Sequence, residues 1–147
     1  MDYTKHQLNE EESKRVYEAC KAYMENKMCY HNIFHAVCRF PREIASGEWK
    51  ITYGYMTSIR NIMVRHCFLV NRQGEVIDPT MYTHERLLDT LPEYVPFYRF
   101  INYERYMAAI EANENYPDLW NHPQVRRHDK HFEESQWVKD NGVFLLR

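Results

Sequence analysis

The amino-acid sequence predicts an α+β fold formed by one domain of 147 residues. Three observations support this prediction. Apolar residues recur every three or four positions before residue 41, alternate with polar residues between 49 and 78, and return to helical spacing further on. Helices grouped at the two ends, with strands between them, are typical of α+β proteins rather than of alternating βα units. We therefore expect amino-terminal helices packed on a small antiparallel sheet, followed by a mainly helical carboxyl-terminal part.

Two helices are predicted at the amino end, after a loose start over residues 1–8. Asn9, followed three residues later by Glu12, is a helix-capping signature, and this helix is expected to run to about residue 26. The second helix covers residues 28–40, with Cys29 in its first turn, and a proline ends it. Its polar residues form one narrow stripe that we expect to be solvated: His31, Asn32, His35 and Arg39.

Strands are predicted where β-branched and aromatic residues alternate with polar ones, after a loop over 42–48: residues 49–56, 64–70 and 75–78. Two further helices are expected over 83–91 and 102–112, joined by a proline-punctuated connection at 91–96. The basic stretch 126–131 is interrupted by an acid and is expected to be a solvated turn. Residues 142–146 are apolar enough to form a short strand that joins the sheet.

The turn between the second and third strands decides which side chains meet across them. Residues 72–74 predict a three-residue hairpin loop with Gly74 in the left-handed conformation. This odd loop length places Phe68 opposite Asp78 and makes His66 a diagonal neighbour of Asp78 on the same face. Diagonal neighbours lie about 7–8 Å apart at Cα, which allows a hydrogen bond between an imidazole and a carboxylate.

The composition excludes several classes of protein. The formal net charge is -2 and no long basic run is present, so the sequence does not predict the basic surface that nucleic-acid-binding proteins use. No apolar run approaches the length of a membrane span, and the first residues do not resemble a signal peptide. The four cysteines lie within predicted helices and strands, so we expect reduced thiols and a cytoplasmic protein. No membrane partner, nucleic-acid partner or cofactor is expected, and the oligomeric state stays open.

Cys29, His66 and Asp78 predict a nucleophilic site. A thiol at a helix start is close to unpaired backbone N–H groups, which favour a thiolate and can stabilise an oxyanion. An imidazole can exchange the proton, and a carboxylate can orient that imidazole. If the apolar face of the second helix packs on the sheet, the thiol reaches the sheet edge near His66. The sequence therefore predicts an enzyme that cleaves or transfers an acyl group at an amide through a thioacyl intermediate.

Two other interpretations use the same sequence. His31, His35 and Cys38 lie on one side of a helix and could bind zinc, although HxxxH pairs are common on solvated helix faces. The twelve tyrosines could instead form the partner-binding surface of a non-catalytic binding or inhibitor protein. Each triad residue also has a structural interpretation by itself, as a buried thiol, a strand histidine or a turn aspartate.

The chain resembles the transglutaminase-like branch of the papain-like superfamily over about residues 23–82. The motifs that carry this resemblance are Met28-Cys29-Tyr30, Tyr53-Gly54-Tyr55, His66-Cys67-Phe68-Leu69-Val70 and Gly74-Glu75-Val76-Ile77-Asp78-Pro79-Thr80. Their order is also similar to that of arylamine N-acetyltransferases. The resemblance implies a papain/transglutaminase-like core with the nucleophile at the start of a central helix.

The same resemblance implies a role for each residue of the triad. Cys29 would be the nucleophile, His66 the base and then the acid, and Asp78 the residue that orients the imidazole. The substrate would be a peptide, a protein or a small amide, and peptidase, amidase, deamidase and acyltransferase activities stay open. Two departures are present: Tyr30 stands where tryptophan is frequent, and no glutamine lies shortly upstream of Cys29. Candidates for substrate or oxyanion contacts are Tyr23, Asn26, Tyr30, Tyr53 and Tyr55.

Overall fold

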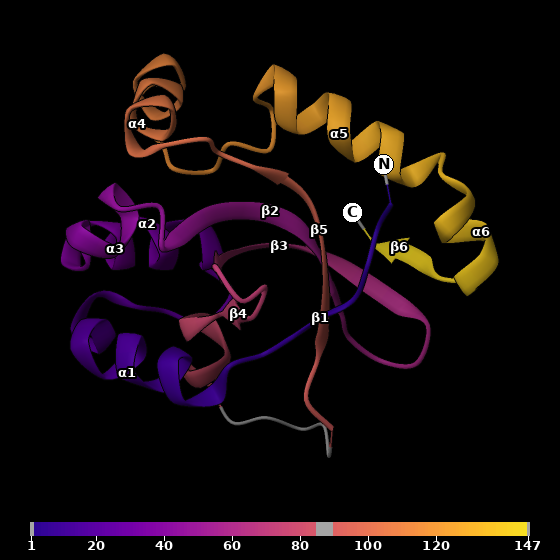
Figure 1. Cartoon of the computed structure of the whole chain (residues 1–147), viewed down its shortest axis with the longest axis horizontal. Helices are drawn as coiled ribbons and strands as arrows, with labels where there is room; N and C mark the ends of the chain where they lie inside the picture. Colours follow the sequence, from indigo (N-terminus) through magenta and orange to yellow (C-terminus); the bar gives the residue numbers. More distant parts are fainter. Residues whose placement is uncertain (1, 85–89, 147) are drawn as a thin grey trace.

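The computed structural model describes residues 2–84 and 90–146 and has an α+β fold with a mixed sheet (Figure 1). The elements follow in the order β1 His6–Gln7, α1 Glu10–Cys20, η1 Lys21–Tyr23, α2 Cys29–Arg39, α3 Pro41–Ala45, β2 Trp49–Thr57, β3 Ile62–Asn71, β4 Val76–Ile77, η2 Pro79–Tyr82, β5 Glu93–Arg99, α4 Tyr103–Ala112, α5 Pro123–Glu133, α6 Gln136–Asn141 and β6 Phe144–Leu146. The helix predicted over 83–91 falls largely on residues 85–89, which lie outside the described residues.

The sheet has the strand order β1-β5-β2-β3-β4, and β6 pairs with β3. All pairings are antiparallel except the one between β6 and β3, so the predicted antiparallel sheet is in fact mixed. A strand at residues 142–146 is confirmed by this pairing. The two sheet edges also meet, because Leu8 beyond β1 forms a parallel bridge with Val76 of β4. The sheet therefore curls around a small interior cluster: Leu8, Phe68, Val70, Val76 and Tyr94.

Strand β5 contradicts the connection predicted at 91–96. Pro96 suggests a break, yet it lies in a strand paired with β2, at a register shift next to Gly54. A Cβ atom at Gly54 would lie 2.3 Å from the carbonyl oxygen of Val95 and 2.9 Å from Cα of Pro96. The absence of a side chain at Gly54 therefore lets the irregular strand approach β2 closely.

The predicted hairpin between β3 and β4 is confirmed. Gly74 has a positive φ of 80°, and its N–H donates to the carbonyl of Asn71 at 3.0 Å. Leu69 pairs with Ile77. Continuing this register by one residue on each strand places Phe68 opposite Asp78, as the three-residue loop predicts.

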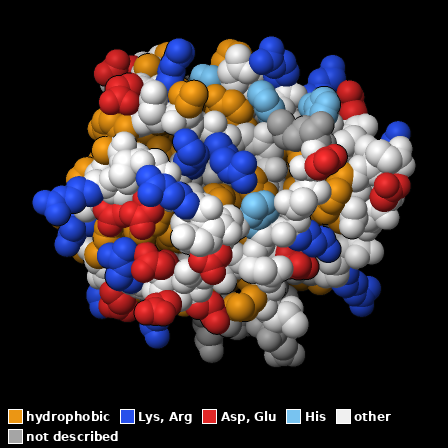
Figure 2. Space-filling view, viewed as in Figure 1, with side chains coloured by type: hydrophobic (Ala, Val, Ile, Leu, Met, Phe, Trp, Pro, Cys, Tyr) orange, Lys and Arg blue, Asp and Glu red, His pale blue; other side chains and the backbone are white. Residues whose placement is uncertain are grey.

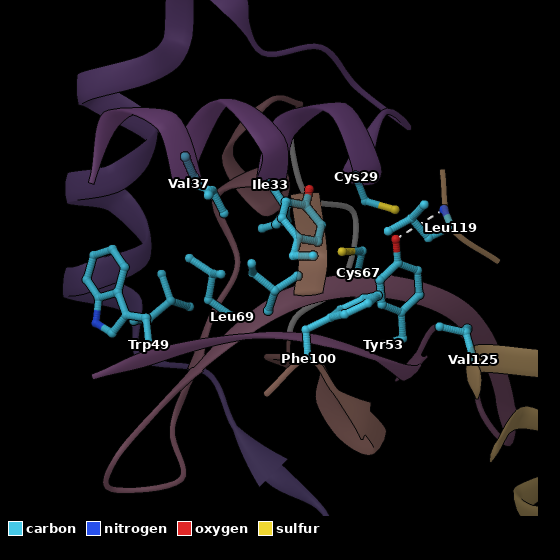
Figure 3. Packing of buried hydrophobic residues seen from close by; sticks show 14 of the residues in the cluster. Cys29, Ile33, Val37, Trp49, Tyr53, Cys67, Leu69, Phe100, Leu119 and Val125 are labelled. Atoms are coloured by element: carbon cyan, nitrogen blue, oxygen red, sulfur yellow. Dashed lines mark hydrogen bonds between the residues drawn. The ribbon is translucent and has the colours of Figure 1, made fainter. Parts of the chain in front are cut away.

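Helix α2 packs over the sheet through its apolar side, where Ile33 and Val37 are buried above Leu69 (Figure 3). Its first residue, Cys29, lies at one end of this contact, above Cys67 of β3 (Figure 3). Helix α1 begins at the predicted cap, because the Asn9 side chain accepts a hydrogen bond from the Glu12 N–H at 2.9 Å. Both amino-terminal helices are thus close to their predicted positions, although α1 gives way to the 3-10 turn η1 after residue 20.

Several predicted loops are regular elements. The segment after Pro41 forms α3 because a proline is well suited to the first turn of a helix. The basic stretch 126–131 lies in α5 instead of a turn, and α6 follows it. The predicted loose start contains β1, which pairs with β5. Asn32, expected in a solvated stripe, is fully buried.

Surface features agree with the even charge balance of the sequence. On the face drawn in Figure 2, basic, acidic and apolar side chains are interspersed, and no one type covers it. Within residues 2–84 and 90–146, no helix is both long and apolar enough to cross a membrane.

Candidate active site

The hairpin brings His66 and Asp78 into direct contact. The Nε2 atom of His66 lies 2.8 Å from Oδ2 of Asp78, and both residues are buried. The hydroxyl of Tyr94 donates to the same carboxylate oxygen at 2.6 Å. One carboxylate oxygen therefore receives two hydrogen bonds, which fixes the imidazole plane and its distance from the acid.

Asp78 is held in place through its backbone as well. Its N–H donates to the hydroxyl of Ser13 in α1 at 2.9 Å, inside the protein. Within the described residues, the second carboxylate oxygen, Oδ1, is buried without a hydrogen-bond partner. A buried carboxylate is stable only beside a positive charge or several donors. These surroundings favour a protonated His66 as that positive charge.

Cys29 is the first residue of α2, and negative charge on its thiol raises the pKa of His66. Because Nε2 of His66 faces Asp78, Nδ1 is the ring nitrogen that is left to exchange a proton with the thiol. In the part of the chain that the structure describes, no side chain caps the amino end of α2, so the backbone N–H groups of its first turn stay available. Cys29 is 7% exposed, and Figure 3 shows its sulfur beyond the helix end, near Leu119.

His66 is charged over a wide pH range. Burial lowers the pKa of His66, but the Asp78 carboxylate and negative charge on Cys29 raise it, to about 10 in total. By contrast, burial raises the pKa of the other three thiols, Cys20, Cys38 and Cys67. All four cysteines are free, and negative charge on Cys29 acts on the His66 imidazole.

Asn32 fixes the approach to the helix that starts at Cys29. Its amide accepts a hydrogen bond from the Glu25 N–H at 3.0 Å and donates to the Glu25 carbonyl at 2.8 Å. It also donates to the hydroxyl of Thr80 at 3.0 Å. Asn32 therefore connects the loop before Cys29 with the segment that follows Asp78.

Tyr53 and Tyr30 position the loop on the other side of the thiol. The Tyr53 hydroxyl donates to the Pro117 carbonyl and accepts from the Leu119 N–H, both at 3.2 Å. The Tyr30 ring stacks on Tyr53 with centroids 5.8 Å apart. Burial raises the pKa of Tyr30, and negative charge on Cys29 raises it further, so its hydroxyl stays protonated beside the thiol.

The other predicted contact residues are less suited to bind an oxyanion. The single hydroxyl protons of Tyr53 and Tyr55 are donated to Pro117 and to Asp129. Tyr23 is 69% exposed and stacks on His35, and Asn26 is exposed. Tyr30 and the first-turn N–H groups of α2 are the candidates that lie next to Cys29.

The residues of the zinc alternative are not brought together. His35 stacks on Tyr23, Cys38 is exposed, and Nδ1 of His31 is buried without a partner in the described part of the chain. Over residues 2–84 and 90–146, no three His, Cys, Asp or Glu side chains form a cluster that could hold a metal ion.

Comparisons with known proteins found no match for the chain. No family model matches it, and no curated protein and no solved structure matches it either.

Two residues that support the site, Ser13 and Asn32, could not be recognised in the sequence, because polar residues within a helix are usually expected on its solvent-exposed face. Ser13 lies three residues before the buried Val16 in α1, and Asn32 lies four residues before the buried Ala36 in α2. This helical spacing places both on buried faces, and it is the one signal that could have suggested their role. Tyr94 is one of the aromatic residues near 94–98 that the sequence suggests as the lining of a cleft, but its hydrogen bond to Asp78 was not predicted. Tyr94 lies in β5, a strand that was not predicted because it contains Pro96.

Proposed function

We propose that this protein is a cysteine-nucleophile enzyme that cleaves or transfers an acyl group at an amide. The observation that carries the proposal is the position of His66, between the Asp78 carboxylate at 2.8 Å and the Cys29 thiol at the start of α2. A thiol, an imidazole and a carboxylate in this order are the groups that thiol acyl transfer needs. A purely structural thiol would gain nothing from a buried imidazolium beside it.

The reaction has two steps. The Cys29 thiolate attacks the substrate carbonyl, and the first-turn N–H groups of α2 stabilise the oxyanion. His66 gives its Nδ1 proton to the departing amine, which leaves a thioester on Cys29. His66 then takes a proton from water or from an acceptor amine, and the attack of that nucleophile releases the acyl group. Asp78 keeps the imidazole oriented and stabilises its charged form.

The same residues support a papain/transglutaminase-like core as part of this proposal. Three features support this core: the order of the three residues, the helix that starts at the cysteine, and the segment Asp78-Pro79-Thr80, which follows β4. The alternative of a tyrosine-rich binding surface has less support, because five tyrosines are buried: Tyr3, Tyr53, Tyr55, Tyr94 and Tyr106.

Thiol alkylation tests the proposal without knowledge of the substrate. At about pH 6, ordinary thiols with a pKa of about 8.5 are almost fully protonated and react slowly with iodoacetamide. We expect Cys29 to be alkylated at least about tenfold faster than the other three cysteines, measured by peptide mass mapping. His66→Ala should abolish this advantage, whereas His35→Ala, which removes a histidine from the same helix as Cys29, should preserve it.

Two results would contradict the proposal. One is faster alkylation of the exposed Cys38 than of Cys29 at this pH. The other is an unchanged Cys29 rate in a folded His66→Ala protein. A panel of amide, ester and glutamine substrates would then separate hydrolysis from acyl transfer, because the two reactions share the thioester and differ in the second nucleophile.

A further inference from the structure

A positively charged cavity of about 790 Å³ lies between β3 and α5, lined by residues of both elements and of the loop that precedes α5. Four basic side chains line it: Arg65, Arg126, Arg127 and Lys130. The acidic side chains in the lining are Asp129 and Glu133, so positive charge is in excess. The side chains of Arg126 and Lys130 are exposed and form no ion pair with other described residues.

Asp129 does not offset this excess toward solvent. It is 4% exposed and accepts hydrogen bonds from the Tyr55 hydroxyl at 2.7 Å and the Trp120 indole N–H at 3.3 Å. It also forms an ion pair with Arg65 at 3.1 Å. The Asp129 carboxylate therefore interacts with side chains inside the protein, where it holds Arg65 and Trp120 in the cavity wall.

Arg65 lies in β3, between this cavity and His66. It directly precedes His66 in β3, and its guanidinium lies over the Trp120 ring, 4.6 Å from the centroid. Its Nε atom is buried and has no hydrogen-bond partner within the described residues. A guanidinium that is held in one orientation loses little entropy when it binds an oxyanion.

The cavity and the thiol share a wall. Trp120 lines the cavity and contacts Tyr30, the residue after Cys29, with ring centroids 6.4 Å apart. Leu119, the neighbour of Trp120, lies next to the Cys29 sulfur (Figure 3). The wall formed by Leu119 and Trp120 therefore lies between the Cys29 sulfur and the basic side chains of the cavity.

We propose that the cavity binds an anionic group of the substrate, a carboxylate or a phosphate, while the acyl carbon lies at Cys29. This inference rests on the proposed function and narrows its substrate class to acidic amides. Arg126 and Lys130 attract the anion, and Arg65 orients it.

Two alkylating reagents of nearly the same size test this inference in the full chain. Iodoacetate carries a carboxylate and iodoacetamide is neutral, so the ratio of their rates at Cys29 measures the attraction of an anion to the site. At about 20 mM ionic strength, we expect the double variant Arg126→Gln/Lys130→Gln to lower this ratio about three- to tenfold. Because both reagents attack the same sulfur, the ratio cancels any change in the reactivity of the thiol itself. Lys139→Gln, which removes an exposed positive charge from α6, is the matched control and should leave the ratio unchanged.

Competition identifies the preferred anion. Inorganic phosphate or acetate is added at constant ionic strength, and the anion that slows the iodoacetate reaction more strongly is the better ligand. An unchanged ratio in the double variant, with Cys29 still reactive toward both reagents, would overturn the anion site and leave the proposed function standing. A Cys29 that reacts with neither reagent would overturn both.

Discussion

Replacing Asp78 by asparagine should destabilise the protein by an amount that depends on pH. The substitution preserves the size of a side chain that is fully buried, and it removes the charge opposite His66. Breaking a buried ion pair by removing one partner costs about 3–5 kcal/mol, and we expect this loss near pH 6. The hydrogen bond from Tyr94 to a charged acceptor is lost in the same change.

The sign of the pH dependence follows from the pKa of His66. This pKa is raised to about 10 in the folded protein, above the ordinary value of 6.5 in an unfolded chain. The stabilisation is therefore fully present below pH 6.5 and is lost as the pH rises toward 10. One proton contributes at most about 1.4 kcal/mol per pH unit, so the difference between the two proteins should shrink to about 1 kcal/mol by pH 10.

Urea denaturation of both proteins at several pH values between 6 and 10 measures this difference. Comparing the two proteins at each pH cancels the titration of groups that they share. A difference in the free energy of unfolding that stays constant over this range would refute the charged His66–Asp78 pair. A difference below about 1 kcal/mol at pH 6 would refute it as well.

Two further substitutions, each paired with a control substitution, test the support of the site and the packing of the sheet. Asn32→Ala removes the hydrogen bonds to the loop before Cys29 and to Thr80, and should lower the free energy of unfolding by about 2–3 kcal/mol and slow the alkylation of Cys29. Arg39→Ala, at the exposed end of the same helix, should change stability by less than about 0.5 kcal/mol and leave the alkylation rate intact. Gly54→Ala places a methyl group against the backbone of β5 and should cost at least about 2 kcal/mol in thermal or urea unfolding, because backbone atoms cannot move aside. Gly47→Ala, with open space around it and a positive φ, should cost about 1 kcal/mol, and equal losses at the two glycines would contradict this argument.

The contact between His66 and Asp78 could be predicted because it depends on local rules. Side chains alternate along a strand, and the three-residue loop ending in Gly74 sets the register, so the two residues had to share a face. The helix that starts at Cys29 was predicted from equally local signals, because an apolar face begins at Cys29 and Pro41 stands just after the end of the helix.

The support around the triad could not be predicted, because it depends on contacts between distant parts of the chain. Tyr94 lies in a strand whose proline suggests a break, and the glycine that accommodates it is in another strand. Asn32 and Ser13 are ordinary polar helix residues until the fold brings Thr80 and Asp78 next to them. Helical spacing places both on buried faces, but no local pattern identifies their partners.

The bridge between Leu8 and Val76 has a consequence for the order in which the molecule assembles. Val76 is two residues before Asp78, so the hairpin that carries the acid is also joined to the first residues of the sheet. Contacts between segments so distant in the chain form late in folding and require the closure of a long loop. Fast alkylation of Cys29 should therefore be the last property that the refolding chain gains. It should also be the first property that the chain loses under mild denaturant.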